Sequence, residues 1–346
     1  MTIKALNRGY VQTVTGPIRP DALGRTLMHE HVLCDITPPE LAVLGLPEVE
    51  ITLENCFEVR YHWCKHTGNH RLVDRDVAIA ELAKLKDCGG SALVELTCGG
   101  IKPDPSGLQA ISRRSGIAII MGCGYYLESF AGDGLAGRSI DELAAEMIVA
   151  VTRGAWGTDV RAGIIGEIGV SDPWSAAERA ALEAAVIAQQ ETGAAVNVHP
   201  GREPNSPFAI VDLVRRAGGD VSHLIISHID RTIFEAESVL RLADTGCVVE
   251  YDFFGIESSY YPFADVDLPN DGQRLRMIRA LIERGHLERI TLSQDICTKT
   301  RLTRWGGHGY GHLFANVVPI MRRCGFSEAE IETVFVETPR RLLTIQ

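Results

Sequence analysis

The sequence lacks the features that mark membrane and secreted proteins. Its 346 residues contain no run of about 18 apolar residues, the length that a membrane-spanning helix needs. The first residues contain no apolar stretch of about 7–15 residues of the kind found in a secretory signal. The nine cysteines form no CxxC pair. These absences predict a cytoplasmic protein with reduced thiols and no membrane segment.

Positive charge is scarce as well. The chain carries 34 Lys and Arg against 45 Asp and Glu, which gives a net charge of −11, and it has no cluster of basic residues. Such a chain repels phosphate backbones, so we expect a small-molecule substrate and no nucleic-acid partner. Lysine is rarest, because the chain contains only Lys4, Lys65, Lys84, Lys86, Lys102 and Lys299.

Short apolar segments alternate with longer segments of helical periodicity. The eight apolar segments are residues 26–33, 91–98, 117–124, 162–169, 194–199, 224–228, 247–252 and 290–295. Near-continuous apolar segments are typical of buried parallel strands, and their alternation with helices indicates a parallel α/β fold. Eight such units predict a (β/α)8 TIM barrel. A doubly wound sheet is the alternative, but the first segment and its turn (TLMHEHVLCD) lack the glycine fingerprint of that fold.

No linker or internal repeat interrupts this pattern. We therefore predict a single domain over residues 1–346, with a short N-terminal extension over residues 1–24 and the barrel over residues 25–346. Since a barrel usually takes about 250 residues, we also expect long loops.

Histidines and acids stand at the ends of five predicted strands. His29 and His31 end the first, Glu167 lies in the fourth, and His199, His228 and Asp295 end the fifth, sixth and eighth. The carboxyl ends of barrel strands meet at one rim, so these side chains are expected to converge. Imidazole and carboxylate donors from separate strands suit a zinc-like metal. A lone buried histidine is more often a hydrogen-bonded core residue, so the metal interpretation depends on the joint placement of all six.

This order of ligands is similar to that of the amidohydrolase superfamily. The opening VQTVTGPIRPDALGRTLMHEHV resembles the phosphotriesterase family in particular. The phosphotriesterase-related branch is the closer match, through GEIGVSD (166–172), EYDFFGIE (250–257), SQDICTKTRL (293–302), GGHGYGHLFANVVPIM (306–321) and ETPRRLL (337–343). The resemblance spans residues 10–346.

The resemblance implies two divalent metal ions, zinc first, with manganese, cobalt and iron as alternatives. His29, His31 and Asp295 would hold the more buried ion, and His199 and His228 the more exposed one. Many phosphotriesterases bridge their ions with a carboxylated lysine. No lysine lies in the fourth apolar segment, so Glu167 is the predicted bridge.

An acid that follows the sixth strand's histidine often acts as a relay in this family. Asp230 lies nearby, but Arg231 occupies the usual position, so the relay stays open.

Two metal ions that bridge a water would lower its pKa and polarise the bond under attack. We predict that the bridging hydroxide attacks a carbonyl. Asp295 would accept its proton and pass it to the leaving group, and His228 is a second catalytic candidate.

The substrate is suggested by the loops. Tyr126 matches a tyrosine that contacts the hydroxide in lactonases of this family, although an aromatic side chain that fills the rim is an equal alternative. The loop after the eighth strand contains a group of candidate substrate-binding residues, which are Lys299, Arg301, Arg304, His308 and Tyr310. Cations there suggest an anionic substrate tail, a carboxylate or a sulfonate, whereas a solvated loop or a dimer contact is the plainer interpretation.

Two further segments bear on the substrate. Phe253 and Phe254 follow Asp252 where the lactonase pattern has an arginine, which counts against homoserine lactones. Residues 55–70 mix aromatic residues and histidines and are expected to cover the mouth of the barrel or to form a dimer surface.

Two glutamates lie within the predicted strands. Glu30 and Glu250 need partners inside the barrel wall, and Arg25 is one candidate for Glu30.

Three functions follow from these patterns. The first is a dinuclear metal hydrolase that acts on an amide or ester of a small N-acylated anionic compound. The second is a lactonase or phosphotriesterase with the same site. The third is a small-ligand-binding protein in which the metal is structural. The resemblance also implies a homodimer.

Overall fold

The structure is a computed structural model that describes residues 8–62, 65–259, 261 and 263–346. Residues 1–7 of the predicted extension and residues 63–64 of the predicted mouth segment lie outside the described part of the chain.

Eight parallel strands form the centre of the molecule. They are β3 (Thr26–Glu30), β6 (Ala92–Glu95), β7 (Ala118–Met121), β8 (Ile165–Gly169), β9 (Val196–His199), β10 (Leu224–Ile226), β11 (Val248–Tyr251) and β12 (Ile290–Leu292). Each lies within one of the eight apolar segments, which confirms the predicted strands. They are paired in parallel as β3–β6–β7 and as β8–β9–β10–β11–β12.

Backbone hydrogen bonds join the two sheets at both edges. Between β7 and β8, the amide of Gly163 donates to the carbonyl of Met121 at 2.9 Å, and that of Gly166 to Cys123 at 2.6 Å. Past the ends of β12 and β3, the amide of Asp295 donates to the carbonyl of His29 at 3.1 Å. These bonds close the (β/α)8 TIM barrel that the sequence predicts.

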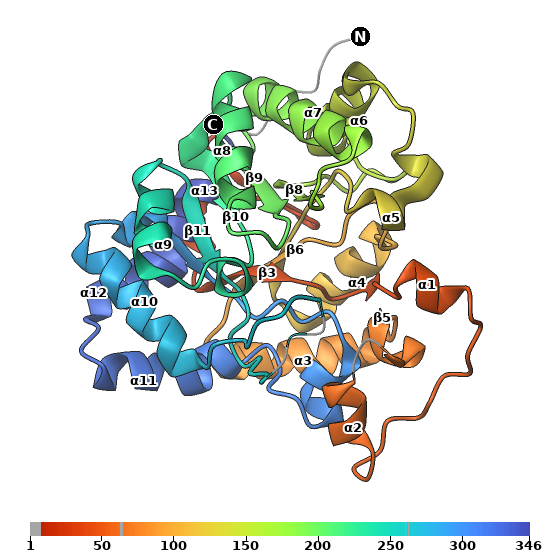
Figure 1. The fold of residues 1–346 in the computed structure, drawn as a ribbon, viewed down its shortest axis with the longest axis vertical. Coiled ribbons are helices and arrows are strands. Elements are labelled where there is room, and N and C mark those ends of the chain that lie inside the picture. The colour runs from red at the N-terminus through yellow and green to blue at the C-terminus, as the bar shows by residue number, and fades with distance from the viewer. Residues whose placement is uncertain (1–7, 63–64, 260, 262) are drawn as a thin grey trace.

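Helices surround the strands (Figure 1). The helices that follow the eight strands in turn are α3 (Arg75–Asp87), α4 (Pro105–Ser115), α6 (Ile140–Thr152), α7 (Ala176–Thr192), α8 (Ser206–Arg216), α9 (Ala236–Asp244), α10 (Asp271–Glu283) and α11 (Val318–Arg323). Ser139, Ser175 and Asn270 begin three of them with capping boxes, in which side chain and backbone satisfy each other's end groups. The local sequence thus fixes where these helices begin.

Smaller elements complete the chain. They are β1 (Val11–Thr13), β2 (Gly16–Ile18), β4 (Cys34–Asp35), β5 (Arg71–Leu72), α1 (Pro39–Ala42), α2 (Cys56–Tyr61), α5 (Glu128–Ala131), α12 (Glu328–Glu332), α13 (Thr338–Leu343) and π-helices over Leu313–Val317 and Thr333–Glu337. Short 3-10 helices include Thr67–His70, Lys299–Arg301 and Thr303–Trp305. No described helix combines the length and the apolar character needed to cross a membrane.

The connection between β3 and α3 is the long loop that the sequence predicts. Figure 1 shows the stretch from α1 to α2 running along one edge of the molecule. Its second helix, α2, contacts the 3-10 helix Lys299–Arg301, which belongs to the loop after β12. Two segments far apart in the sequence therefore meet above the strand ends.

Candidate metal centre

The six predicted ligands meet at the carboxyl ends of the strands. His29 and Glu167 lie in β3 and β8, and His199 ends β9. His31 directly follows β3, and His228 and Asp295 lie in the turns just after β10 and β12. All six are buried, with Asp295 the most exposed at 8%. The structure thus brings together every residue of the predicted set.

Glu167 lies at the centre of this group. Its Oε2 atom is 3.0 Å from His199 Nδ1, 3.5 Å from His228 Nε2 and 3.7 Å from His29 Nε2. Its Oε1 atom is 3.4 Å from His31 Nε2. One carboxylate therefore faces four imidazoles that come from three different strands, β3, β9 and β10.

Asp295 faces the same group from the opposite side of the barrel. Its Oδ1 atom is 3.3 Å from His31 Nε2 and 3.7 Å from His29 Nε2. Asp295 and His228 both have left-handed backbone, with φ of 45° and 54°. Non-glycine residues adopt this conformation at a cost of about 1–2 kcal/mol, and such strain is concentrated at functional sites.

The geometry fits a cation. His29 Nε2 is completely buried, faces Glu167 and Asp295, and has no hydrogen-bond partner within the described part of the chain. Three groups bring at least three donor atoms within 4.8 Å of one another: His29, His31 and Glu167; Glu167, His199 and His228; and His29, His228 and Asp252. Nitrogen and oxygen donors in such groups suit a divalent metal.

The charges of the group are strongly coupled. Burial alone would raise the pKa of Glu167, but His29, His199 and His228 hold that pKa well below its usual range. Burial lowers the pKa of His31, yet its hydrogen bonds to Asp295 and Glu167 outweigh this and raise it to about 9. Burial and the neighbouring His228 lower the pKa of His199 to about 3. The buried carboxylates thus require positive charge beside them, from protons or from a cation.

Asp252 is a further candidate residue that the sequence did not single out. It follows β11 and accepts hydrogen bonds from the amide and Nδ1 of His228, at 3.0 and 2.9 Å. Its Oδ2 atom is also 3.2 Å from His29 Nδ1. Asp252 therefore orients two of the candidate ligands. Its place at the end of the seventh apolar segment was the available signal.

The two buried glutamates of the barrel wall find partners. Glu250 accepts hydrogen bonds from Asn197 and Ser227, both at 2.8 Å. Glu30 accepts from the Ser293 hydroxyl at 2.8 Å and the Ile296 amide at 2.9 Å, and thereby fixes the turn that carries Asp295. The suggested partner of Glu30 was wrong, because Arg25 lies over the ring of Phe314 instead.

The residues after His228 take separate places. Asp230 accepts hydrogen bonds from Arg274 Nε at 2.7 Å and the Phe253 amide at 3.0 Å, which makes it part of a buried ion pair. Arg231 donates from Nη2 to His199 Nε2 at 3.1 Å. The relay position left open by the sequence thus holds a cation that contacts the group, and the carboxylate beside His228 is that of Asp252.

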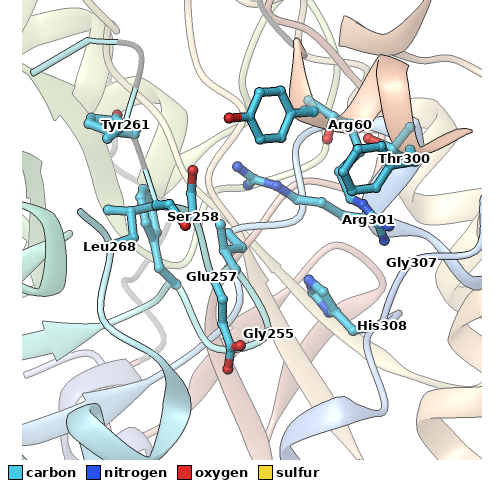
Figure 2. A pocket seen from close by; sticks show the side chains of 16 residues that line it. Arg60, Gly255, Glu257, Ser258, Tyr261, Leu268, Thr300, Arg301, Gly307 and His308 are labelled. Carbon is cyan, nitrogen blue, oxygen red and sulfur yellow. The ribbon is translucent and has the colours of Figure 1, made fainter. Parts of the chain in front are cut away.

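A cavity of about 510 Å³ adjoins the group. Phe253 and Arg301 line it and connect it to the group, because the Phe253 ring lies 5.3 Å from that of His228 and Arg301 Nη1 lies 3.7 Å from Asp295 Oδ2. In Figure 2, Tyr261, Leu268 and Ser258 lie on one side of the cavity, and Arg60, Thr300 and Arg301 on the other. One wall thus combines the apolar groups of Tyr261 and Leu268 with the polar side chains of Glu257 and Ser258, and the other carries two arginines.

The predicted substrate-binding residues do not share one cavity, and Tyr126 and Arg304 line neither of the two described below. Arg301 and His308 line the large cavity, and Tyr126 packs edge-on against the His199 ring at 4.9 Å. Lys299 and Tyr310 line a different cavity of about 220 Å³, where the Tyr310 hydroxyl donates to the carbonyl of His31. Phe57, Arg60 and Tyr61 of α2 line the large cavity, as expected for a segment that covers the mouth.

Known proteins share this architecture. The sequence model of the phosphotriesterase family matches residues 9–343. The N-acetyltaurine hydrolase of Bos taurus is 38% identical over 344 residues, which cover 98% of this chain and 99% of that protein. The structure of a resiniferatoxin-binding protein from Rhodobacter sphaeroides is similar, with a TM-score of 0.91 and 37% identity, over 98% of this chain and 96% of that one. The phosphotriesterase homology protein from Escherichia coli, solved with phosphate in its active site, has a TM-score of 0.77 and 28% identity over 93% of this chain and 99% of its own.

Proposed function

Because the chain belongs to the phosphotriesterase family of metal-dependent hydrolases, we propose that it uses two divalent metal ions to hydrolyse the amide bond of a small N-acylated anionic compound. The observation that carries this proposal is the convergence of four histidines and two carboxylates from five strands, with a buried, unpartnered imidazole nitrogen among them.

The donors divide into two sets that share one carboxylate. His29, His31 and Asp295 would hold one ion, His199 and His228 the other, and Glu167 contact both. The preferred ion is zinc, with manganese, cobalt or iron as alternatives. Divalent ions at such a site supply Lewis acidity and make water more acidic.

Asp295 is the group that moves the proton. Burial alone would raise the pKa of Asp295, but the hydrogen bond from His31 and the charges of His29 and His228 hold it below its usual range. Its carboxylate accepts a proton from the attacking water. As the carbon–nitrogen bond breaks, the same proton passes to the leaving amine. His228, held by Asp252, is the second candidate for this transfer.

The substrate class is supported by the relatives and by the cavity. The Bos taurus relative is named for the hydrolysis of N-acetyltaurine, an N-acylated sulfonate, and it aligns with nearly the whole chain. Arg60 and Arg301 on the cavity wall make the approach to the metal centre electrostatically favourable for an anionic compound.

A substrate panel tests this function. Protein loaded with zinc or manganese is given N-acetyltaurine, an N-acetyl amino acid, a lactone and a phosphotriester, and kcat/KM is compared. We expect the highest value for an anionic N-acyl amide. A higher kcat/KM for the lactone or the phosphotriester would show that the substrate is not an N-acyl amide and would favour the lactonase or phosphotriesterase alternative. No turnover with two bound ions would favour the ligand-binding alternative.

We further propose a homodimer in the cytoplasm. Exposed apolar side chains between α1 and the end of α2 support an interface between copies: Val43, Leu44, Leu46, Val49, Leu53, Phe57 and Tyr61. The eight described cysteines are free thiols, which supports a reducing compartment. Light scattering should give the mass of two chains, and the mass of one would contradict the dimer.

A further inference from the structure

Two cations of the loop after β12 already face carboxylates, and the third, Arg304, is exposed and lies over the ring of Trp305. Arg301 Nη1 lies 3.7 Å from Asp295 Oδ2, and Lys299 Nζ lies 4.0 Å from Glu48 Oε2. An ion pair of this kind compensates much of the charge that an anionic substrate would otherwise neutralise. The strongest unpaired cations near the metal centre therefore have to be sought elsewhere.

Arg231 is the most deeply buried of them. Its side chain is only 1% exposed, and it donates to His199 Nε2 at 3.1 Å, the Pro200 carbonyl at 3.1 Å and the Thr232 hydroxyl at 3.2 Å. These acceptors are all neutral, and no described carboxylate forms an ion pair with it. Nearby Asp252 is engaged by His228 and His29. Burying a charge without an ion pair lowers the stability of the fold, so the position of Arg231 needs an explanation.

Arg202 is a second cation beside the first. It lies in the loop after β9, with its guanidinium 4.8 Å from the ring centre of Phe263 and 5.8 Å from that of Tyr261. Its Nε atom is buried and has no hydrogen-bond partner among the described residues. Arg202 follows His199, the ligand that Arg231 contacts, by three residues, so both arginines belong to the same side of the metal centre.

The surroundings place this pair at the edge of the metal centre. Arg231 contacts His199 directly, and Tyr261, which Arg202 covers, also lines the large cavity. A ligand between the two arginines would thus touch the side of the centre that β9 and β10 form. The apolar wall of the cavity, with Phe253 and Leu268, lies beyond.

We infer that Arg202 and Arg231 form the subsite that binds the anionic group of the substrate, a sulfonate or a carboxylate. This inference rests on the proposed amide hydrolysis and specifies how that site recognises its substrate. The guanidinium groups donate to the anionic oxygens, and the anion supplies the negative charge that neither arginine finds among the described residues. With the tail held there, the acyl group points toward the large cavity.

The test compares two amides that differ in charge. N-acetyltaurine carries a sulfonate, and N-acetylethanolamine carries a neutral hydroxyl in its place. Wild-type protein and the variants Arg202→Gln, Arg231→Gln, Arg60→Gln and Arg113→Gln are assayed on both. Arg113 is an exposed arginine of α4 and serves as the matched control. Arg60 represents the rival site in the cavity.

We expect Arg202→Gln to lower kcat/KM for N-acetyltaurine by about tenfold or more, chiefly through KM, because hydrogen bonds to charged groups are lost. Its kcat/KM for N-acetylethanolamine should stay within about twofold of wild type, since that substrate has no anion to bind. Ethanesulfonate, an inert anion, should also inhibit this variant more weakly. Arg231→Gln should lower kcat/KM for N-acetyltaurine more than for N-acetylethanolamine, and it should also lower kcat for both amides because Arg231 contacts His199. If it does not fold, Arg202→Gln alone decides.

Three results would overturn the subsite. First, Arg202→Gln could lower kcat/KM for both amides equally. Second, Arg60→Gln, and not Arg202→Gln, could remove the preference for N-acetyltaurine. Third, the wild type could show no preference for N-acetyltaurine over N-acetylethanolamine. In each case amide hydrolysis itself would stand. A wild-type protein that hydrolyses neither amide refutes the proposed function and the subsite with it.

Discussion

The metal centre and the large cavity differ in how firmly their residues are held. Each histidine of the centre has a second contact behind it: Asp252 for His29 and His228, Thr97 for His31, and Arg231 for His199. By contrast, α2 contributes Phe57 and Tyr61 to the cavity with exposed fractions of 65% and 59%. The strand ends are therefore built for fixed chemistry, and the loops are free to adapt to the substrate.

The largest effect on turnover is expected at Asp295. Asp295→Asn should lower kcat by about 10²–10⁴-fold, because the amide cannot accept the proton from water. Metal content, measured by elemental analysis, should change little, since Glu167 and the histidines remain. Unchanged hydrolysis with the metal retained would remove Asp295 from the mechanism.

The next prediction, with a smaller expected effect, distinguishes the roles of two neighbouring buried acids, Asp252 and Asp230. Asp252→Asn should weaken metal binding by about 10–100-fold, because Asp252 orients His29 and His228. A metal titration with a competing chelator measures this change.

Asp230→Asn is its matched control. Asp230 pairs with Arg274 at 2.7 Å and does not contact the histidines, so its loss should lower the free energy of unfolding by about 3–5 kcal/mol. Denaturant unfolding measures that loss, and metal affinity should stay near wild type. If both variants weaken metal binding equally, Asp252 has no special orienting role.

The smallest effect is expected at the mouth. Phe57→Ala should raise KM by about two- to fivefold and leave kcat nearly unchanged, because it removes contact area from the cavity and not from the metal centre. Leu53→Ala, at a side chain that is 93% exposed and outside the cavity lining, should change neither constant. A fall in kcat for Phe57→Ala would show that the mouth takes part in the chemical step.

The strand ends could be predicted from the sequence because two local signals coincide there. An apolar segment marks each buried strand, and a histidine or acid directly after it marks the rim, as with His199 and Asp295. The barrel itself follows from the same segments, and the structure confirms all eight.

The partners of side chains were harder to predict because they are distant in the sequence. Glu48 faces Lys299, which turns that lysine away from the large cavity. The Tyr310 hydroxyl donates its hydrogen bond to the carbonyl of His31. Conversely, nothing in the sequence reveals that Arg231 is buried without an ion pair to any described carboxylate.

Glu167 is proposed to hold both ions, and metal stoichiometry measures this role. Wild-type protein and Glu167→Gln are stripped with a chelator, reconstituted with zinc, and assayed for bound metal and for hydrolysis of N-acetyltaurine. We expect about two ions per chain and full activity for wild type. Glu167→Gln should hold at most about one ion and lose most of its activity. Full wild-type activity without metal, or two ions and full activity in Glu167→Gln, would contradict this role.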